Sequence, residues 1–91
     1  SELETLEQQV TQFEEELEQV RKKEQEWQLE LDHFQRQKSM VTNEREFTAV
    51  INEIDYATRA LDEASTRRKE LEEHLEKATL ELEERRQARP E

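Results

Sequence analysis

The chain of 91 residues contains no cysteine and no glycine, and its only proline is Pro90. Without cysteine it can form neither a disulfide nor a thiolate metal site. It has no apolar run approaching the roughly 20 residues that a membrane-spanning helix needs, and its opening does not resemble a signal peptide. We therefore expect a soluble, cytoplasmic protein that makes no use of a membrane.

Hydrophobic residues are also scarce, at 31% of the chain against 43% charged residues, with a formal net charge of -11. That is too little to fill a three-dimensional core, and without a pattern it would indicate disorder. However, the apolar residues are regularly spaced among good helix formers. A coiled coil accounts for both observations, because only a narrow seam has to be buried.

Two heptad runs are present, and apolar residues fill most of their a and d positions. The a and d positions of the first run are Leu3, Leu6, Val10, Phe13, Leu17, Val20, Glu24, Trp27, Leu31, Phe34, Lys38 and Val41. Those of the second run are Phe47, Val50, Ile54, Ala57, Leu61, Ala64, Arg68, Leu71, Leu75, Ala78, Leu82, Arg85 and Arg89.

The two runs differ in phase. The first would place its next a position at Arg45, whereas the second begins at Phe47. Two extra residues turn a helix by about 200°, so the two stripes would face opposite sides of a continuous helix. Asn43 and Glu46 also have the spacing of a capping box, in which each side chain bonds the other residue's backbone N–H.

The sequence therefore predicts an all-α fold, an antiparallel two-helix coiled-coil hairpin with its turn near residues 39–43. The single unit spans residues 1–91, with a first helix over about 2–39, a turn over about 40–43 and a second helix over about 44–89, which Pro90 should end. The hairpin could be monomeric or pair into a dimer. The alternative is a rod fragment of a parallel homodimer that tolerates the phase change as a kink.

A tight turn would set Val41 against Phe47. Trp27 would then face Leu61 and Phe13 would face Leu75, so that large residues of the first arm repeatedly face small or medium ones of the second. Glu24 would lie about one turn from Arg68 and could pair with it. A register one heptad looser is the alternative.

The stretch "MVTNEREFTAVINEIDYATRALDEA" resembles the hairpin tip of the bacterial C4-type zinc-ribbon family, in which a long antiparallel coiled coil precedes a small ribbon holding zinc with four cysteines. The matching positions are Thr42, Asn43, Glu46, Phe47, Ala49, Glu53 and Ile54. The resemblance implies that this chain is the hairpin alone, and that any zinc belongs to a ribbon in the parent protein. It further implies an adaptor linked to transcription or secretion.

Two candidate partner-binding surfaces emerge. The tip candidates are Val41, Thr42, Asn43, Arg45 and Phe47, although capping alone would explain Asn43, and Arg45 has the least evident structural duty. Leu29 and Tyr56 lie outside the seam at similar heights and could form an outer apolar patch, although single exposed apolar residues are common. We interpret Trp27 as a core residue.

We expect no catalytic, cofactor-binding or metal-binding residues. Glu70 and His74 are spaced i, i+4 but lack a third ligand, and His33 would lie far away. The carboxylates lie on a convex rod with no pocket to exclude water. The clusters Arg21–Lys23 and Arg67–Lys69 are short and flanked by glutamates, which favours salt bridges between helices over nucleic-acid contacts.

The predicted function is that of a non-enzymatic interaction arm or adaptor whose protein partner is not identified by the sequence. The alternative is a nucleic-acid-binding regulator in which the hairpin only positions the missing ribbon. The acidic balance makes nucleic acid a poor partner for this piece itself.

Overall fold

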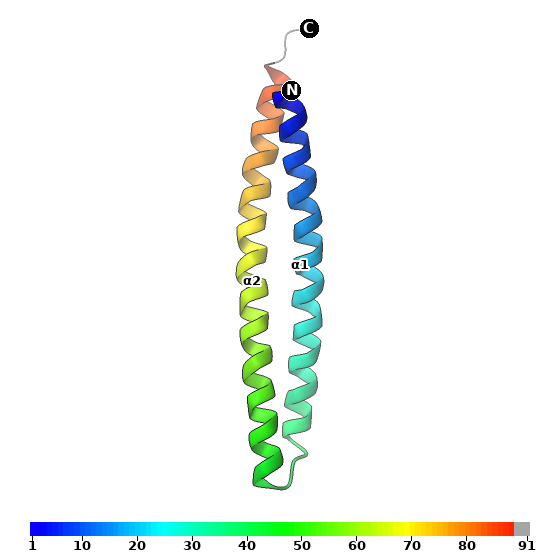
Figure 1. The fold of residues 1–91 in the computed structure, drawn as a ribbon, viewed down its shortest axis with the longest axis vertical. Coiled ribbons are helices and arrows are strands. Elements are labelled where there is room, and N and C mark those ends of the chain that lie inside the picture. The colour runs from blue at the N-terminus through cyan, green and yellow to red at the C-terminus, as the bar shows by residue number, and fades with distance from the viewer. Residues whose placement is uncertain (89–91) are drawn as a thin grey trace.

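The computed structural model describes residues 1–88 and contains two helices, α1 (Glu2–Lys38) and α2 (Glu44–Gln87), which run antiparallel side by side. They form an extended rod with both described ends at one end and the turn at the other (Figure 1). At 1.5 Å per residue α2 is about 66 Å long, whereas the Cα trace is only 16 × 13 Å across. The predicted all-α hairpin is confirmed.

The turn forms where the phase of the heptads changes. Asn43 has an extended backbone (φ -134°, ψ 159°), and its side-chain oxygen accepts a hydrogen bond of 2.8 Å from the backbone N–H of Glu46. A capping box has two hydrogen bonds, and this is the one that is present among the described residues. At the end of α1, the Ser39 hydroxyl donates a 2.6 Å bond to the carbonyl of Arg36. A polar side chain therefore satisfies a backbone group on each side of the turn.

The observed helix bounds lie close to the predicted ones. Helix α1 ends at Lys38, one residue before the predicted end, and α2 begins at Glu44 as predicted. Helix α2 ends at Gln87, whereas Arg89 and Pro90 lie outside the described residues. The alternative of a parallel homodimeric rod required one continuous helix through Asn43, and the chain instead reverses there.

The core is the predicted seam. Every buried residue occupies a predicted a or d position: Leu6, Leu17, Val50, Ala57, Leu71, Ala78 and Leu82. Ala57 and Leu71 are fully buried (0% exposed). Most large seam residues of α1 are only half-buried, because each helix of a two-helix coil has a neighbour on one side only. The predicted seam positions Lys38, Phe47 and Arg85 are exposed, since they lie near the ends of the interface where the opposite helix gives little cover.

Two aromatic contacts establish the register. The Phe13 ring stacks on His74 with 5.5 Å between the ring centroids, one residue from the predicted partner Leu75. Trp27 makes an edge contact with Tyr56, also at 5.5 Å. A shift of one heptad would move His74 about 10 Å along the axis from Phe13, so these contacts fit the tight register.

The Asn43 cap gives a direct test of the turn. Replacing Asn43 with alanine removes the acceptor for the Glu46 N–H, and we expect a loss of about 1 kcal/mol in the free energy of unfolding. The control is Asn52→Ala, in the interior of α2, where alanine is the better helix former and should stabilise by a few tenths of a kcal/mol, roughly. Urea denaturation followed by circular dichroism measures both. Equal effects at the two positions would contradict the capping role.

The fully buried Ala57 tests the packing of the seam. Ala57→Leu adds three carbon atoms where no space exists, so we expect a loss of about 1–3 kcal/mol in the free energy of unfolding. The matched control Ala49→Leu changes an exposed position of the same helix, and its effect should stay within about 0.5 kcal/mol. An Ala57→Leu protein as stable as the wild type would show that the helices are not in close contact there.

Candidate functional site

A charged cluster occupies the two polar seam positions that the sequence suggested could pair. Arg68 Nε donates a hydrogen bond of 2.8 Å to Glu24 Oε1, which confirms that pair. The Ser65 hydroxyl donates to Glu24 Oε2, and Arg68 Nη1 donates a 2.6 Å bond to Glu72. Glu24 and Arg68 are both only part-exposed, with 23% and 27% of their side chains accessible. The cluster links the two helices through hydrogen bonds of defined direction, so it reinforces the register.

The same hydrogen bonds change the proton affinity of the cluster. The bonds from Ser65 and Arg68 hold the pKa of the Glu24 carboxyl below its ordinary value, because they stabilise the ionised form. Hydrogen bonding to Glu24 raises the pKa of the Arg68 guanidinium, which stays protonated. A depressed carboxyl pKa means that the stabilisation is present above the pKa of unfolded Glu24 and is lost as the pH falls through the folded value.

Further ion pairs join the helices in the half of the rod that carries the two described ends. Arg67 lies 3.1 Å from Glu16, and Arg21 lies 3.4 Å from Glu72. Nearer the open end, Arg85 and Arg86 pair with Glu2 and Glu7 at 2.6 and 3.8 Å. The predicted use of the basic clusters in salt bridges between helices is thus confirmed for Arg21, Arg67 and Arg68. Each exposed pair adds only about 0–1 kcal/mol, but together they favour one register.

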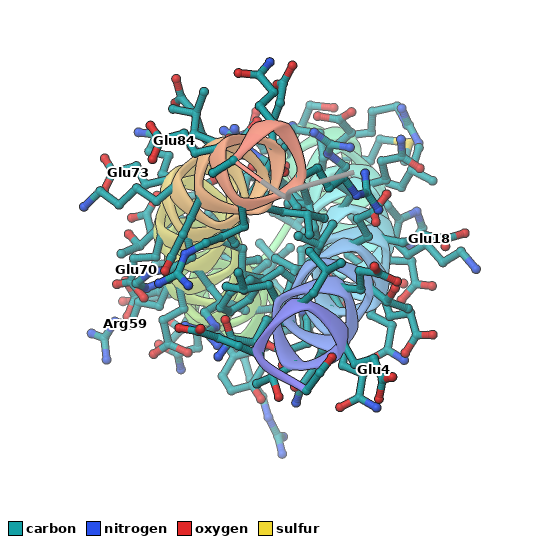
Figure 2. The ribbon with its side chains drawn as sticks, turned by 90° about the horizontal axis from the view of Figure 1, so that it is seen from above. Glu4, Glu18, Arg59, Glu70, Glu73 and Glu84 are labelled. Carbon is teal, nitrogen blue, oxygen red and sulfur yellow. The ribbon has the colours of Figure 1, made fainter. Side chains whose placement is uncertain are left out.

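The remaining charges surround the rod. The view along the long axis shows Glu4, Glu18, Arg59, Glu70, Glu73 and Glu84 pointing outward from both helices (Figure 2). The carboxylates among them are exposed to solvent.

The half of the rod near the turn is held differently. Within the described residues, no ion pair joins α1 to α2 on the turn side of Glu24. Instead an open groove of about 990 Å³ runs along one flank of the seam. Its aromatic residues are Trp27, Phe34 and Tyr56. It is also lined by Lys23, Glu26, Glu30, Asn52 and Glu53.

The groove continues toward the turn. A smaller hollow of about 370 Å³ is lined by residues of both helices and of the turn: Gln37, Met40, Val41, Glu46, Ala49, Val50 and Glu53. Glu53 lines both spaces, so they lie end to end on the same flank. We call the two together the tip groove. Most of its apolar and aromatic lining side chains are buried or half-buried, whereas its glutamates are exposed. The apolar groups therefore form the floor and the glutamates lie along the edges.

The tip candidates have different environments. Val41 is half-buried and lines the tip groove. Thr42 and Asn43 are exposed, and Asn43 serves as the helix cap. Arg45 is exposed and takes part in no ion pair among the described residues, while Phe47 is 43% exposed. The turn therefore presents a cation and an aromatic ring to solvent, and binding by these residues stays a prediction.

The two residues of the proposed outer patch have different surroundings. Leu29 and Tyr56 are both exposed, at 68% and 67%. Tyr56, however, contacts Trp27 and lines the tip groove, whereas Leu29 is not among the lining residues. The interpretation of Trp27 as a pure core residue is incomplete, since it is half-buried and its remaining surface faces this groove.

Sequence reasoning missed two exposed apolar residues, Met40 (70% exposed) and Leu80 (54% exposed). Met40 lines the tip groove, whereas Leu80 lies outside it on α2. A signal for the groove was available in the heptads, because Glu30 and Glu53 both occupy g positions, which face each other along one flank of an antiparallel pair.

The two histidines are in contact with aromatic rings rather than with each other. His74 stacks on Phe13, and His33 lies 5.7 Å from Phe34. Within residues 1–88 no three His, Asp or Glu side chains gather in a way that could hold a metal ion. In the same range, neither helix has a stretch that is both long and apolar enough to pass through a membrane.

No protein-family model, curated protein or solved structure matches the chain.

The depressed pKa of Glu24 leads to a pH-dependent prediction. Glu24→Gln should lower the midpoint of thermal unfolding at pH 7, because the amide cannot pair with Arg68 as an anion. The difference from the wild type should begin to shrink as the pH falls below the pKa of an unfolded glutamate, about 4.3, and should shrink further as the wild-type carboxyl becomes protonated at lower pH. The control is Glu15→Gln, at an exposed glutamate outside the ion pairs described above. We expect it to leave the midpoint of thermal unfolding unchanged at pH 7 and at low pH. A difference that is constant between pH 7 and about pH 3 would contradict the role of the charge.

Proposed function

We propose that the chain is a non-enzymatic interaction arm, an adaptor that presents its turn-side half to a protein partner. The tip groove is the observation that carries this proposal. It exposes part of Trp27 and most of Tyr56 beside a turn that displays Arg45 and Phe47. Aromatic residues and arginine are the residue types enriched where binding energy concentrates in protein interfaces.

The contrast between the two halves of the rod supports this location. Ion pairs join the helices through the half with the two described ends, whereas the turn-side half relies on apolar contacts. A surface that binds a partner has to keep apolar groups accessible in the free protein. The turn-side half meets that requirement.

The surroundings of the carboxylates support a non-enzymatic role. General acid–base catalysis requires a group held close to a bound substrate, usually in a cavity that excludes water. The glutamates of the tip groove lie at the edges of an open furrow, where water reaches them freely. The groove suits a large partner surface better than a small substrate.

The resemblance to the zinc-ribbon family supports the more specific proposal of a bacterial adaptor linked to transcription or secretion. In that proposal a ribbon of the parent protein holds zinc, and the hairpin holds none. In the alternative, the ribbon binds nucleic acid and the hairpin only positions it. That alternative gains no support from the arginines of the two basic clusters, because Arg21, Arg67 and Arg68 are already paired with glutamates.

Site-specific photo-crosslinking in cells of the source organism tests the proposed function. A photoreactive phenylalanine analogue replaces Tyr56 in the tip groove, Arg45 at the turn, or Leu80 as a control. Tyr56 and Leu80 are both exposed residues of α2, so they match in helix and in exposure and differ in whether they line the groove. We expect a discrete protein adduct from position 56 or 45 and none from position 80.

Two results would overturn the proposal. One is the absence of any adduct at positions 56 and 45, and the other is the same set of adducts at all three positions. Circular dichroism of each substituted protein shows whether the hairpin is intact, so that a folding defect is not mistaken for a lost contact.

A further inference from the structure

We propose that the tip groove binds a basic amphipathic helix of the partner, which packs against α1 and α2 as the third helix of a short three-helix bundle. This inference rests on the proposed function and adds the chemistry of the partner segment. Three features support it: the half-covered seam, the length of the groove and the charge of its edges.

The half-covered seam explains why a helix fits. Trp27 and Phe34 occupy d positions of α1, and Val41 lies at the next d position, just past the end of the helix. All three remain half-buried because α2 covers them from one side only. Their uncovered surface faces the same groove. A third helix whose apolar residues recur at i, i+3, i+4 and i+7 would cover this surface, as in helix-in-groove recognition.

The length of the groove limits the partner segment. Along α1 the lining runs from Lys23 to Val41, just past the end of the helix. At 1.5 Å per residue this stretch measures about 27 Å, which corresponds to a helix of about 18 residues or five turns. A segment of that length can carry about eight to ten apolar residues on one face, three to four for every two turns.

The charge of the edges selects a basic helix. Four glutamates line the tip groove, at positions 26 and 30 on α1 and at 46 and 53 on α2, whereas Lys23 is its only cation. None of the four glutamates takes part in an ion pair among the described residues. Lysine or arginine beside the apolar face of a partner helix would therefore meet carboxylates on both edges.

The same charges argue against a second copy of this chain as the occupant. Two copies would each bring a formal charge of -11, and juxtaposed grooves would place glutamates against glutamates. Like charges brought together at an interface oppose binding. A partner with the opposite charge has no such penalty.

The test uses a displayed library of 18-residue helical peptides with a fixed leucine stripe. The positions beside the stripe are varied between lysine and glutamate, and every peptide lacks tryptophan. Selection on the wild-type chain should enrich lysine at these positions. The tightest basic peptide should bind at least about tenfold more strongly than its glutamate counterpart. Trp27 is the only tryptophan of the chain, so its fluorescence should shift to shorter wavelength when the groove is covered.

Matched double variants separate the groove from general charge attraction. Glu30→Lys with Glu53→Lys reverses the charge of the groove edges, whereas Glu73→Lys with Glu84→Lys makes the same change in net charge at outward-pointing positions (Figure 2). None of these four glutamates belongs to an ion pair among the described residues, so both variants should fold. We expect the groove variant to lose at least about tenfold in affinity for the basic peptide. The control should lose much less.

Any of the following results would overturn the inference. No enrichment, or enrichment of glutamate, rejects a basic helix as the occupant. Equal losses in the two double variants, or binding without a shift in Trp27 fluorescence, place the peptide outside the groove. A dimer in sedimentation equilibrium whose formation shifts Trp27 emission assigns the groove to a second copy. If the crosslink at position 56 or 45 is found while these tests fail, the proposed function stands and only the chemistry of the partner is wrong.

Discussion

The close contact between small side chains of α2 and larger side chains of α1 determines how the two helices lie against each other. Ala57 and Ala78 are buried in the seam, where their small side chains leave room for α1, and Leu6 and Leu17 of α1 are buried in the same seam. A chain with so few hydrophobic residues has no other core, so the stability and straightness of the rod depend on this one layer. Because the layer is thin, large residues such as Trp27 keep part of their surface in solvent.

This incomplete burial connects the fold to the proposed function. In the half of the rod with the two described ends, ion pairs outside the seam also join the helices. Arg68 itself occupies a seam position there and pairs with Glu24. Toward the turn no such pairs join the helices among the described residues, and the flank of the seam opens into the tip groove. One end of the rod is thus suited to holding the hairpin together, and the other to meeting a partner.

Much of the fold could be predicted because it depends on local patterns. The step of two residues between the heptad runs, together with the capping spacing of Asn43 and Glu46, located the turn within a residue. The pair of Glu24 and Arg68 followed from heptad arithmetic. The candidate site was harder to predict. Tyr56 was recognised as exposed, but its contact with Trp27 and its place in the tip groove were not predicted. Heptad positions describe each helix separately and do not tell how far a side chain reaches across to its neighbour.

The sequence by itself therefore determined the two helices, the turn and the residues of the seam, since periodicity and capping act within a few residues of the chain. Only the tertiary structure decided which flank of the seam is open and which residues line it. That outcome depends on the relative rotation of the two packed helices and on the side-chain conformations of Trp27, Phe34 and Tyr56. Both are determined by contacts between residues that are distant in the sequence.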